Sequence, residues 1–469
     1  MYQVMPFRIQ VLIFLCGLFN NFAYVVSLSA AKIIFSTEIV SSHTHRKAHT
    51  VVSQVLFYAD GPAFIAQFCA PFLLKIITYN KRILILSILC TSSLLLIGFN
   101  EESTGFYSKY FSIVGIILTS IMFGFGESTF YSLWSSFPKK AIGCFAAGTG
   151  AAGIVGSGVF DILLRMFGMK TTLIILASFG IIFYILYMQV LSPYHQRLLF
   201  IIDDDLQNKT QNLDIEAVKA DVEETKQLLP LQNEDREGKK THRQHHCNEG
   251  DKNDATVIMR SVCTYFIPLY ILYVVTFLSN HGFLPHLIRN EKFRNEKSYV
   301  QNETNDYYYV NLFLTYQLSV FFARSSIKFV NKMLALNLPI QKLYIWIIIV
   351  FQILLTWAIY VDTSLYRGFI SQSNVSSRMP IAHTPIADET TNIFSWAMFE
   401  QNVIEYKQYF LVFIQGILSG LGYLLCFHLA RLDIENNNHK DFIMGIICTA
   451  TTAGPLTSAI IGTYYFEKY

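Results

Sequence analysis

Apolar stretches of about 20 residues recur along this chain and alternate with short polar segments. Because an α-helix rises ~1.5 Å per residue, such a stretch can cross a hydrocarbon core of ~30 Å. The pattern therefore predicts eleven transmembrane helices, six before a long polar segment and five after it. Their predicted bounds are 8–34, 51–78, 83–99, 108–136, 141–167 and 171–191, then 257–287, 307–329, 338–360, 404–430 and 442–466.

The composition favours an all-α polytopic membrane protein. Of 469 residues, 52% are hydrophobic and only 15% are charged, and the net charge of +3 is too small to indicate a nucleic-acid partner. The sequence shows no nucleophile–base pair and no cluster with metal-ligand spacing, so we expect neither an enzyme nor a metal site, and no cofactor. Gly148, Gly150 and Gly153 have the spacing of a dinucleotide fingerprint, but no strand precedes them, and small residues at this spacing favour close helix packing.

Basic residues predict the orientation of the chain in the membrane. Pairs such as Lys139-Lys140 lie in short loops on one side of the predicted spans, and the positive-inside rule makes that side cytosolic. The N-terminus then also lies in the cytosol, and an odd number of spans places the C-terminus on the other side. Acceptor tripeptides for glycosylation begin at Asn302 and Asn374, both on the predicted non-cytosolic side.

A polar segment between the sixth and seventh spans divides the chain. It is too rich in charge to bury a core, so we expect a cytosolic linker. Within it, Glu224 and the pair Leu228-Leu229 form an acidic dileucine pattern, which a sorting adaptor can capture in an extended chain. This pattern predicts delivery to endosomes and lysosomes. The predicted divisions are an N-terminal six-helix lobe at 1–191, the linker at 192–256 and a C-terminal five-helix lobe at 257–469.

The two lobes have related sequences. Gly124 and Gly126 of the fourth span correspond to Gly420 and Gly422 of the tenth, and the small-residue stretch of the fifth span corresponds to one in the eleventh. Parallel repeats around a central linker are typical of major-facilitator transporters, in which the substrate site lies at mid-membrane between the lobes. The predicted fold is therefore major-facilitator-like, with two pseudo-symmetric halves and a lipid bilayer around them.

Polar and ionisable residues within predicted spans are costly in lipid and often mark a transport pathway. Glu127 and Tyr131 are four residues apart and share one face of the fourth span. The candidates for substrate binding or coupling are Asn20, Asn21, Tyr24, Asp60, Glu127, Tyr131, His281, Arg324, Gln415 and His428.

Several of these candidates have a second interpretation. Glu127 is either a coupling group or a structural acid paired with a cation. Asp60 precedes a Gly-Pro pair, which is typical of a hinge. Arg324 suits a substrate phosphate or carboxylate, but its side chain can also reach the headgroups. Asp161 and Arg165 are four residues apart and are expected to pair with each other.

Five stretches of this sequence resemble the battenin family. The resemblance runs through both lobes and covers nearly all of the chain outside the linker and the loops. The residues that carry it are Cys16–Ala31, Gly124–Phe130, Gly148–Gly153, Ala323–Ser326 and Phe427-His428.

The resemblance implies a lysosomal and late endosomal membrane protein with an eleven-span, major-facilitator-like fold. The family is linked to juvenile neuronal ceroid lipofuscinosis, to clearance of glycerophosphodiesters, to lysosomal pH and to arginine handling. Glu127, Arg324 and His428 match family positions, whereas Gln415 stands where members can carry glutamate. Asp161 falls where the human-type sequence is uncharged. Lipid-anchoring signals seen in some members do not appear here, so we expect no such anchor.

We therefore expect a transporter that exports small polar metabolites from lysosomes. Glycerophosphodiesters are the first substrate expected and basic amino acids such as arginine the second, with Arg324 on the anionic group and Glu127 carrying the proton or counter-charge. The alternative is a non-transporting membrane scaffold that regulates endolysosomal trafficking or the proton pump through its linker. Equilibrative nucleoside transporters share the eleven-span layout and are the second choice among transporters.

Overall fold

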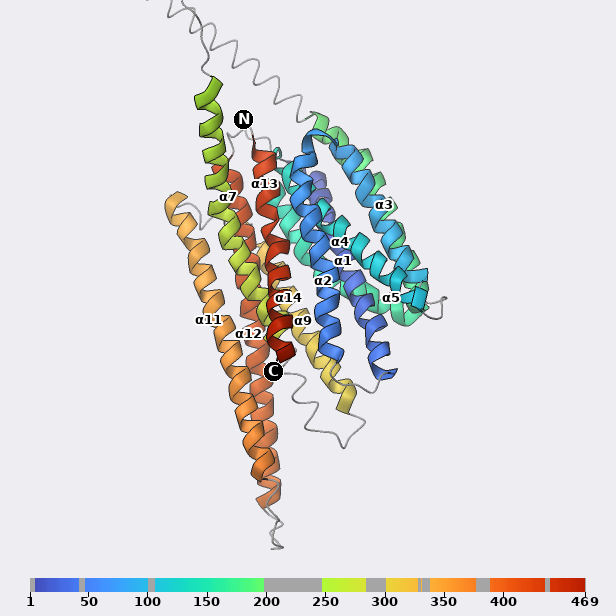
Figure 1. Cartoon of the computed structure of the whole chain (residues 1–469), viewed down its shortest axis with the longest axis vertical. Helices are drawn as coiled ribbons and strands as arrows, with labels where there is room; N and C mark the ends of the chain where they lie inside the picture. The colour runs from blue at the N-terminus through green and yellow to red at the C-terminus, as the bar shows by residue number, and fades with distance from the viewer. Residues whose placement is uncertain are drawn as a thin grey trace, which may run out of the picture.

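Every element in the described part of the chain is helical (Figure 1). The computed structural model describes residues 5–41, 47–99, 106–197, 247–283, 301–327, 330, 338–376, 389–434 and 439–468. The N-terminal lobe contains α1 (Phe7–Ser41), α2 (Lys47–Cys69), η1 (Ala70–Lys75), α3 (Tyr79–Gly98), α4 (Phe106–Ser135), α5 (Lys140–Leu186) and η3 (Tyr187–Leu191). The C-terminal lobe contains α7 (Cys247–Phe277), η4 (Leu278–Phe283), α9 (Gln301–Ser325), α11 (Leu338–Ser376), α12 (Glu389–Asp433), α13 (Lys440–Cys448) and α14 (Ala450–Lys468).

Membrane-crossing helices account for most of the predicted spans. Eight helical stretches among the described residues are long and apolar enough to cross a membrane, and one of them, Lys140–Arg197, has 58 residues and covers two predicted spans. Those two spans are separate helices, because the chain breaks at Gly168, whose φ of 75° lies in the region that favours glycine. The remaining two predicted spans coincide with α2 and α9.

Several helices are longer than their apolar segments. α12 begins at Glu389, before the predicted 404, and α11 continues to Ser376, past the predicted 360. α7 already begins at Cys247. Hydropathy marks only the part of a helix that lies in hydrocarbon, so polar extensions on either side escape it. The last predicted span is also divided, because α13 ends at Cys448 and α14 begins after Thr449.

Glycine contacts show the pseudo-symmetry of the two lobes. A Cβ on Gly124 would meet Ala63 of α2, and one on Gly420 would meet Val320 and Ala323 of α9, the helix that corresponds to α2. The second glycines of the two pairs behave in the same way. Gly126 faces α1 and α3, while Gly422 faces the corresponding α7 and α11. Equivalent glycines thus permit equivalent close crossings in both halves.

Further glycines lie at the contact between the lobes. In Figure 1 the blue and cyan helices of the N-terminal lobe lie beside the orange and red helices of the C-terminal lobe. Gly150 of α5 lies against Phe321 and Arg324 of α9, and Gly445 of α13 lies against Ser128 and Ser132 of α4. These crossings bring α5 against the last two turns of α9 and α13 against the second half of α4, and the candidate site lies beside them.

Close packing of α1 on α5 predicts that Gly148→Ala destabilises the fold. A Cβ there would lie 1.9 Å from the carbonyl oxygen of Phe14, so the two backbones must separate. We expect a loss of ~1–3 kcal/mol, as for other overpacked sites, seen as a lower thermal unfolding temperature in detergent. Gly158→Ala in the same helix is the matched control, because its Cβ would meet nothing within 4 Å. Equal unfolding temperatures for both variants would contradict the close crossing.

Candidate functional site

Glu127 of α4 lies at the contact between the two lobes and is 2% exposed. Its Oε1 accepts a hydrogen bond from the Tyr423 hydroxyl of α12 at 2.9 Å. Its Oε2 accepts from Thr451 of α14 at 2.9 Å and from the Gln67 amide of α2 at 3.0 Å. Within the described residues no lysine, arginine or histidine forms an ion pair with it. Three neutral donors, two of them from the opposite lobe, therefore hold this carboxylate. The interpretation of Glu127 as an acid paired with a cation does not match these contacts.

Arg324 of α9 points into the same interface. Its Nη1 donates to the Thr149 hydroxyl of α5 at 2.8 Å and its Nη2 to the Tyr273 hydroxyl of α7 at 3.0 Å, while its Nε has no hydrogen-bond partner. The side chain is 9% exposed, so the alternative in which it reaches the headgroups is wrong. Gly150 makes the room for it, because a Cβ there would lie 3.3 Å from the Arg324 Cδ.

Tyr423 connects the acid and the guanidinium. Its hydroxyl donates to Glu127, and the Arg324 Cζ lies 3.8 Å from the centroid of its ring, which is cation–π geometry. The Tyr131 hydroxyl donates to the Tyr423 hydroxyl at 2.6 Å, and the Tyr131 ring stacks on Phe427 with centroids 3.8 Å apart. The two charged groups of opposite lobes thus act on one aromatic side chain.

A discontinuous helix borders this cluster. α13 and α14 meet at Thr449, and Thr451 and Thr452 follow in the first turn of α14. The Gln67 amide lies between them, since its Nε2 donates to Cys448 and Thr451 and its Oε1 accepts from Thr452. Helices broken at mid-membrane are a recurrent feature of substrate sites in transporters.

The structure brings Glu127, Tyr131 and Arg324 together and places the other described candidates elsewhere. Tyr24 donates to Asp60 at 2.7 Å, and Asn20 donates to the carbonyl of Phe123, all within the N-terminal lobe. The Gly-Pro pair after Asp60 does not interrupt α2, which continues to Cys69. The structure therefore shows no helix break that would support a hinge at this position.

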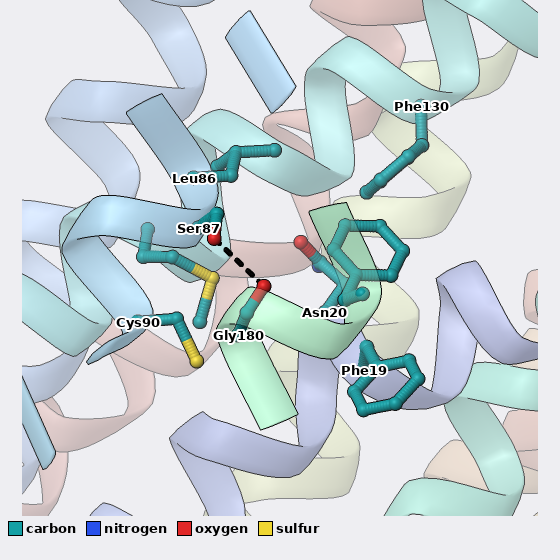
Figure 2. A pocket seen from close by; sticks show the side chains of 9 residues that line it. Phe19, Asn20, Leu86, Ser87, Cys90, Phe130 and Gly180 are labelled. Carbon is teal, nitrogen blue, oxygen red and sulfur yellow. Dashed lines mark hydrogen bonds between the residues drawn. The ribbon is translucent and has the colours of Figure 1, made fainter. Parts of the chain in front are cut away.

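Asn20 also lines a small apolar pocket in the N-terminal lobe, with a cavity volume of about 20 Å³ (Figure 2). Figure 2 shows the Ser87 hydroxyl donating to the Gly180 carbonyl across it, a bond of 2.7 Å between α3 and α5. Neither Glu127 nor Arg324 lines this pocket. It lies between packed helices of one lobe, so it is distinct from the interlobe site.

Further candidates occupy other regions. Gln415 is buried in the C-terminal lobe and donates to the Thr276 carbonyl at 3.4 Å. His428 is buried near Lys139 and Arg431, whose charges act on it. Asp161 and Arg165 form the expected pair at 3.0 Å, on an exposed surface. Asn21, beside Asn20, accepts a bond from it at 3.2 Å.

Some of the predicted functional residues lie outside what the structure describes. Glu224, Leu228 and Leu229 fall in the gap 198–246. The side chains of His281, Asn302 and Asn374 are also outside the described part, although their backbones lie in η4, α9 and α11.

Sequence reasoning missed five residues of the interlobe cluster. None is charged, and similar neutral polar residues occur at many positions of the predicted spans, so residue type alone did not single out four of them. Tyr423 alone had one, because it directly follows Gly422 of the repeated glycine pair. The missed residues are Gln67, Thr149, Tyr273, Tyr423 and Thr451.

The lobes are also joined at the Lys139 end of the molecule. Asp441 of α13 accepts hydrogen bonds from Ser135 of α4 and, at 3.5 Å, from Tyr79 of α3, and its backbone carbonyl accepts from Ser132 at 2.9 Å. Arg431 of α12 donates to the Phe137 carbonyl at 3.4 Å. Since these bonds cross between the lobes, this end is closed in the structure.

Two pseudo-symmetric helical lobes with a polar, charged contact between them define a membrane protein with a major-facilitator-like fold. A solved structure of this class, the proton:xylose symporter XylE bound to 6-bromo-6-deoxy-D-glucose, matches with a TM-score of 0.53 at 11% identity, over 98% of this chain and 88% of that one. The chain belongs to the CLN3 protein family, whose family model matches residues 11–468.

Curated relatives agree with the battenin resemblance. Protein BTN1 of Kluyveromyces lactis is 26% identical, covering 96% of this chain and 91% of the relative. Battenin of Canis lupus familiaris is 23% identical, covering 95% and 88%. Protein BTN1 of Saccharomyces cerevisiae is 26% identical, covering 96% and 91%.

The position of Tyr423 predicts that Tyr423→Phe destabilises the protein more than Tyr131→Phe does. The first change leaves a buried carboxylate oxygen of Glu127 without its donor, and the second removes a bond between two neutral hydroxyls. We expect a loss of ~1–3 kcal/mol for Tyr423→Phe and ~1 kcal/mol for Tyr131→Phe, measured by thermal unfolding in detergent. The reverse order would show that Tyr423 does not hold Glu127.

The contacts of Asp441 predict that Ser135→Ala opens the Lys139 end. Losing one bond to a charged group, worth ~1.5 kcal/mol, increases the open population about tenfold. Cys448 is buried beside Gln67, so its thiol becomes accessible when this end opens. The measurement is the rate at which a membrane-impermeant thiol reagent, added on that side, labels Cys448 in a variant without the other cysteines. Ser157→Ala is the control, since the Ser157 hydroxyl donates to the Gly153 and Ile154 carbonyls of its own helix. Unchanged labelling in Ser135→Ala would refute this closure.

Proposed function

We propose that this protein is a transporter of lysosomal and late endosomal membranes that exports small polar metabolites by alternating access. Glycerophosphodiesters are the first substrate class and basic amino acids such as arginine the second. Lysosomal pH homeostasis follows from the associated movement of charge. The observation that carries this proposal is the meeting of Arg324 and Glu127, from opposite lobes, on Tyr423.

Arg324 is the anion-binding group in this proposal. A guanidinium offers planar paired donors that match the oxygens of a phosphodiester or a carboxylate. Its present partners, the hydroxyls of Thr149 and Tyr273, carry no charge, and its Nε has no partner. An anionic substrate can therefore replace neutral partners and supply the counter-charge that the buried cation lacks.

Glu127 carries the proton or the counter-charge. Neutral donors surround it, so it can gain or lose a proton without breaking an ion pair. With a basic amino acid, the Glu127 carboxylate would hold the cationic group while Arg324 holds the carboxylate. Both arrangements use one site, with the anionic Glu127 on one lobe and the cationic Arg324 on the other.

Substrate binding would act directly on the contact between the lobes. The Arg324–Thr149 and Tyr423–Glu127 hydrogen bonds both cross the interface, so a ligand that replaces either changes how the lobes are held. Coupling of this kind is what alternating access requires, because the ligand must bind the two states differently.

Delivery to the lysosome rests on the acidic dileucine pattern. In our proposal Glu224, Leu228 and Leu229 bind sorting adaptors from the cytosolic segment 192–256, and the N-terminus is also cytosolic. The scaffold alternative would place the whole function in this segment. Its partners would be trafficking proteins or the proton pump.

The test is metabolite profiling of lysosomes that lack this protein and are supplied with wild type or with Glu127→Gln. We expect glycerophosphodiesters to accumulate without the protein and wild type to clear them, while Glu127→Gln loses clearance at least tenfold. Asp161→Asn is the matched control, because Asp161 lies on an exposed surface. It should clear normally.

Two outcomes would refute parts of the proposal. Full clearance by Glu127→Gln would leave that residue a structural role only. If no small metabolite accumulates, and deletion of 206–240 abolishes function while Glu127→Gln spares it, the protein is a scaffold. Arg324→Lys keeps the charge but loses the planar donor pair, so it should raise the KM for either substrate class.

A further inference from the structure

A second cluster of buried polar groups lies in the C-terminal lobe, around Thr276 of α7. The Gln352 amide of α11 donates to the Thr276 hydroxyl at 3.0 Å, and the Gln415 amide of α12 donates to the Thr276 carbonyl at 3.4 Å. Both amide nitrogens are thereby engaged, and both amide oxygens have no hydrogen-bond partner. Thr276, Gln352 and Gln415 are fully buried, with 0% exposure.

The cluster extends by one helical turn. Tyr265 of α7 and Lys342 of α11 both donate hydrogen bonds to Asp433. Later in the sequence of the same two helices, Thr276 of α7 and Gln352 of α11 bond to each other. α7 and α11 therefore run in the same direction. Asn280 and Thr356, each four residues after one of the meeting pair, lie at the next level.

Five buried oxygens in this region have no hydrogen-bond partner. Each side chain is at most 6% exposed. The atoms are Ser279 Oγ, Asn280 Oδ1, Gln352 Oε1, Thr356 Oγ1 and Gln415 Oε1. Buried acceptors without a donor are uncommon in folded proteins and call for an ion or ordered water. The chain also changes here from α- to π-helix at η4, a distortion that is frequent at functional sites.

Apolar contacts separate this cluster from the interlobe site. Leu272, one turn before Thr276, packs against the position of Gly422, which Ile348 also contacts. Gln415 lies eight residues from Tyr423 on α12, about 12 Å along the helix. The two polar regions are therefore distinct, and the second lies farther from Lys139.

We propose that this cluster is a binding site for a monovalent metal cation, sodium or potassium. Amide and hydroxyl oxygens are hard ligands of the kind that such ions bind, and the engaged amide nitrogens leave these oxygens free to face a cation. The named side chains include no carboxylate, and divalent magnesium or calcium sites normally use at least one. The cation contacts oxygens of α7, α11 and α12 and holds these helices together.

The test is thermal unfolding of the purified full-length protein in NaCl, KCl or N-methylglucamine chloride at constant ionic strength. We expect a saturable rise in Tm with sodium or potassium over N-methylglucamine. Thr356→Val keeps the side-chain shape, removes one oxygen and should weaken the apparent affinity about tenfold, the ratio that ~1.4 kcal/mol represents. Ser458→Ala is the matched control, because the buried Ser458 hydroxyl already donates to the Val274 and Gly454 carbonyls. Its cation response should stay unchanged.

Gln415→Glu keeps the proposal testable if Thr356→Val does not fold, since the added charge should tighten cation binding at least tenfold. Equal Tm values in all three salts, or a cation response that neither variant alters, would show that the cluster holds water only. Glu127→Gln should keep the full cation response, so this result is independent of the transport assay.

Discussion

The hydrogen bond from Tyr423 to Glu127 is the interaction on which the interlobe site depends. A carboxylate in a bilayer needs internal partners, and here two of its three donors belong to the opposite lobe. The ring that carries the donating hydroxyl also lies under Arg324. Acid, aromatic ring and guanidinium therefore form one unit across the lobe boundary, and moving the lobes apart breaks it.

Glycines allow close helix packing inside each lobe. Gly17 and Gly148 bring α1 and α5 to backbone contact, and Gly416 and Gly420 do the same for α12 on α9. Such contacts are close and sensitive to one methyl group. Glycine contacts also join the lobes, as at Gly150, but there they stand beside several hydrogen bonds between side chains, which water or a ligand can replace.

The sequence predicts the fold well because hydropathy and glycine spacing are local properties. Eleven apolar runs, the repeated glycine pairs and the helix break between the fifth and sixth spans all follow from neighbouring residues. Glu127 and Arg324 were found because charge in an apolar run is conspicuous. Gln67 and Thr451 were not, since a neutral side chain gains its role only when lateral packing sets it beside the acid. Gln415 was expected at the interface, and the packing places it against Thr276 instead.

α12 links three polar levels of the molecule. Arg431 bonds across the lobes at the Lys139 end, Tyr423 holds the centre and Gln415 reaches the Thr276 cluster. These residues are eight apart, and each step of eight turns the side-chain direction by about 80°, so they leave one helix in three different directions. A rigid helix that contacts all three levels cannot shift at one without shifting at the others. A cation bound at the Thr276 cluster, as we propose, would therefore restrain the same helix that carries Tyr423.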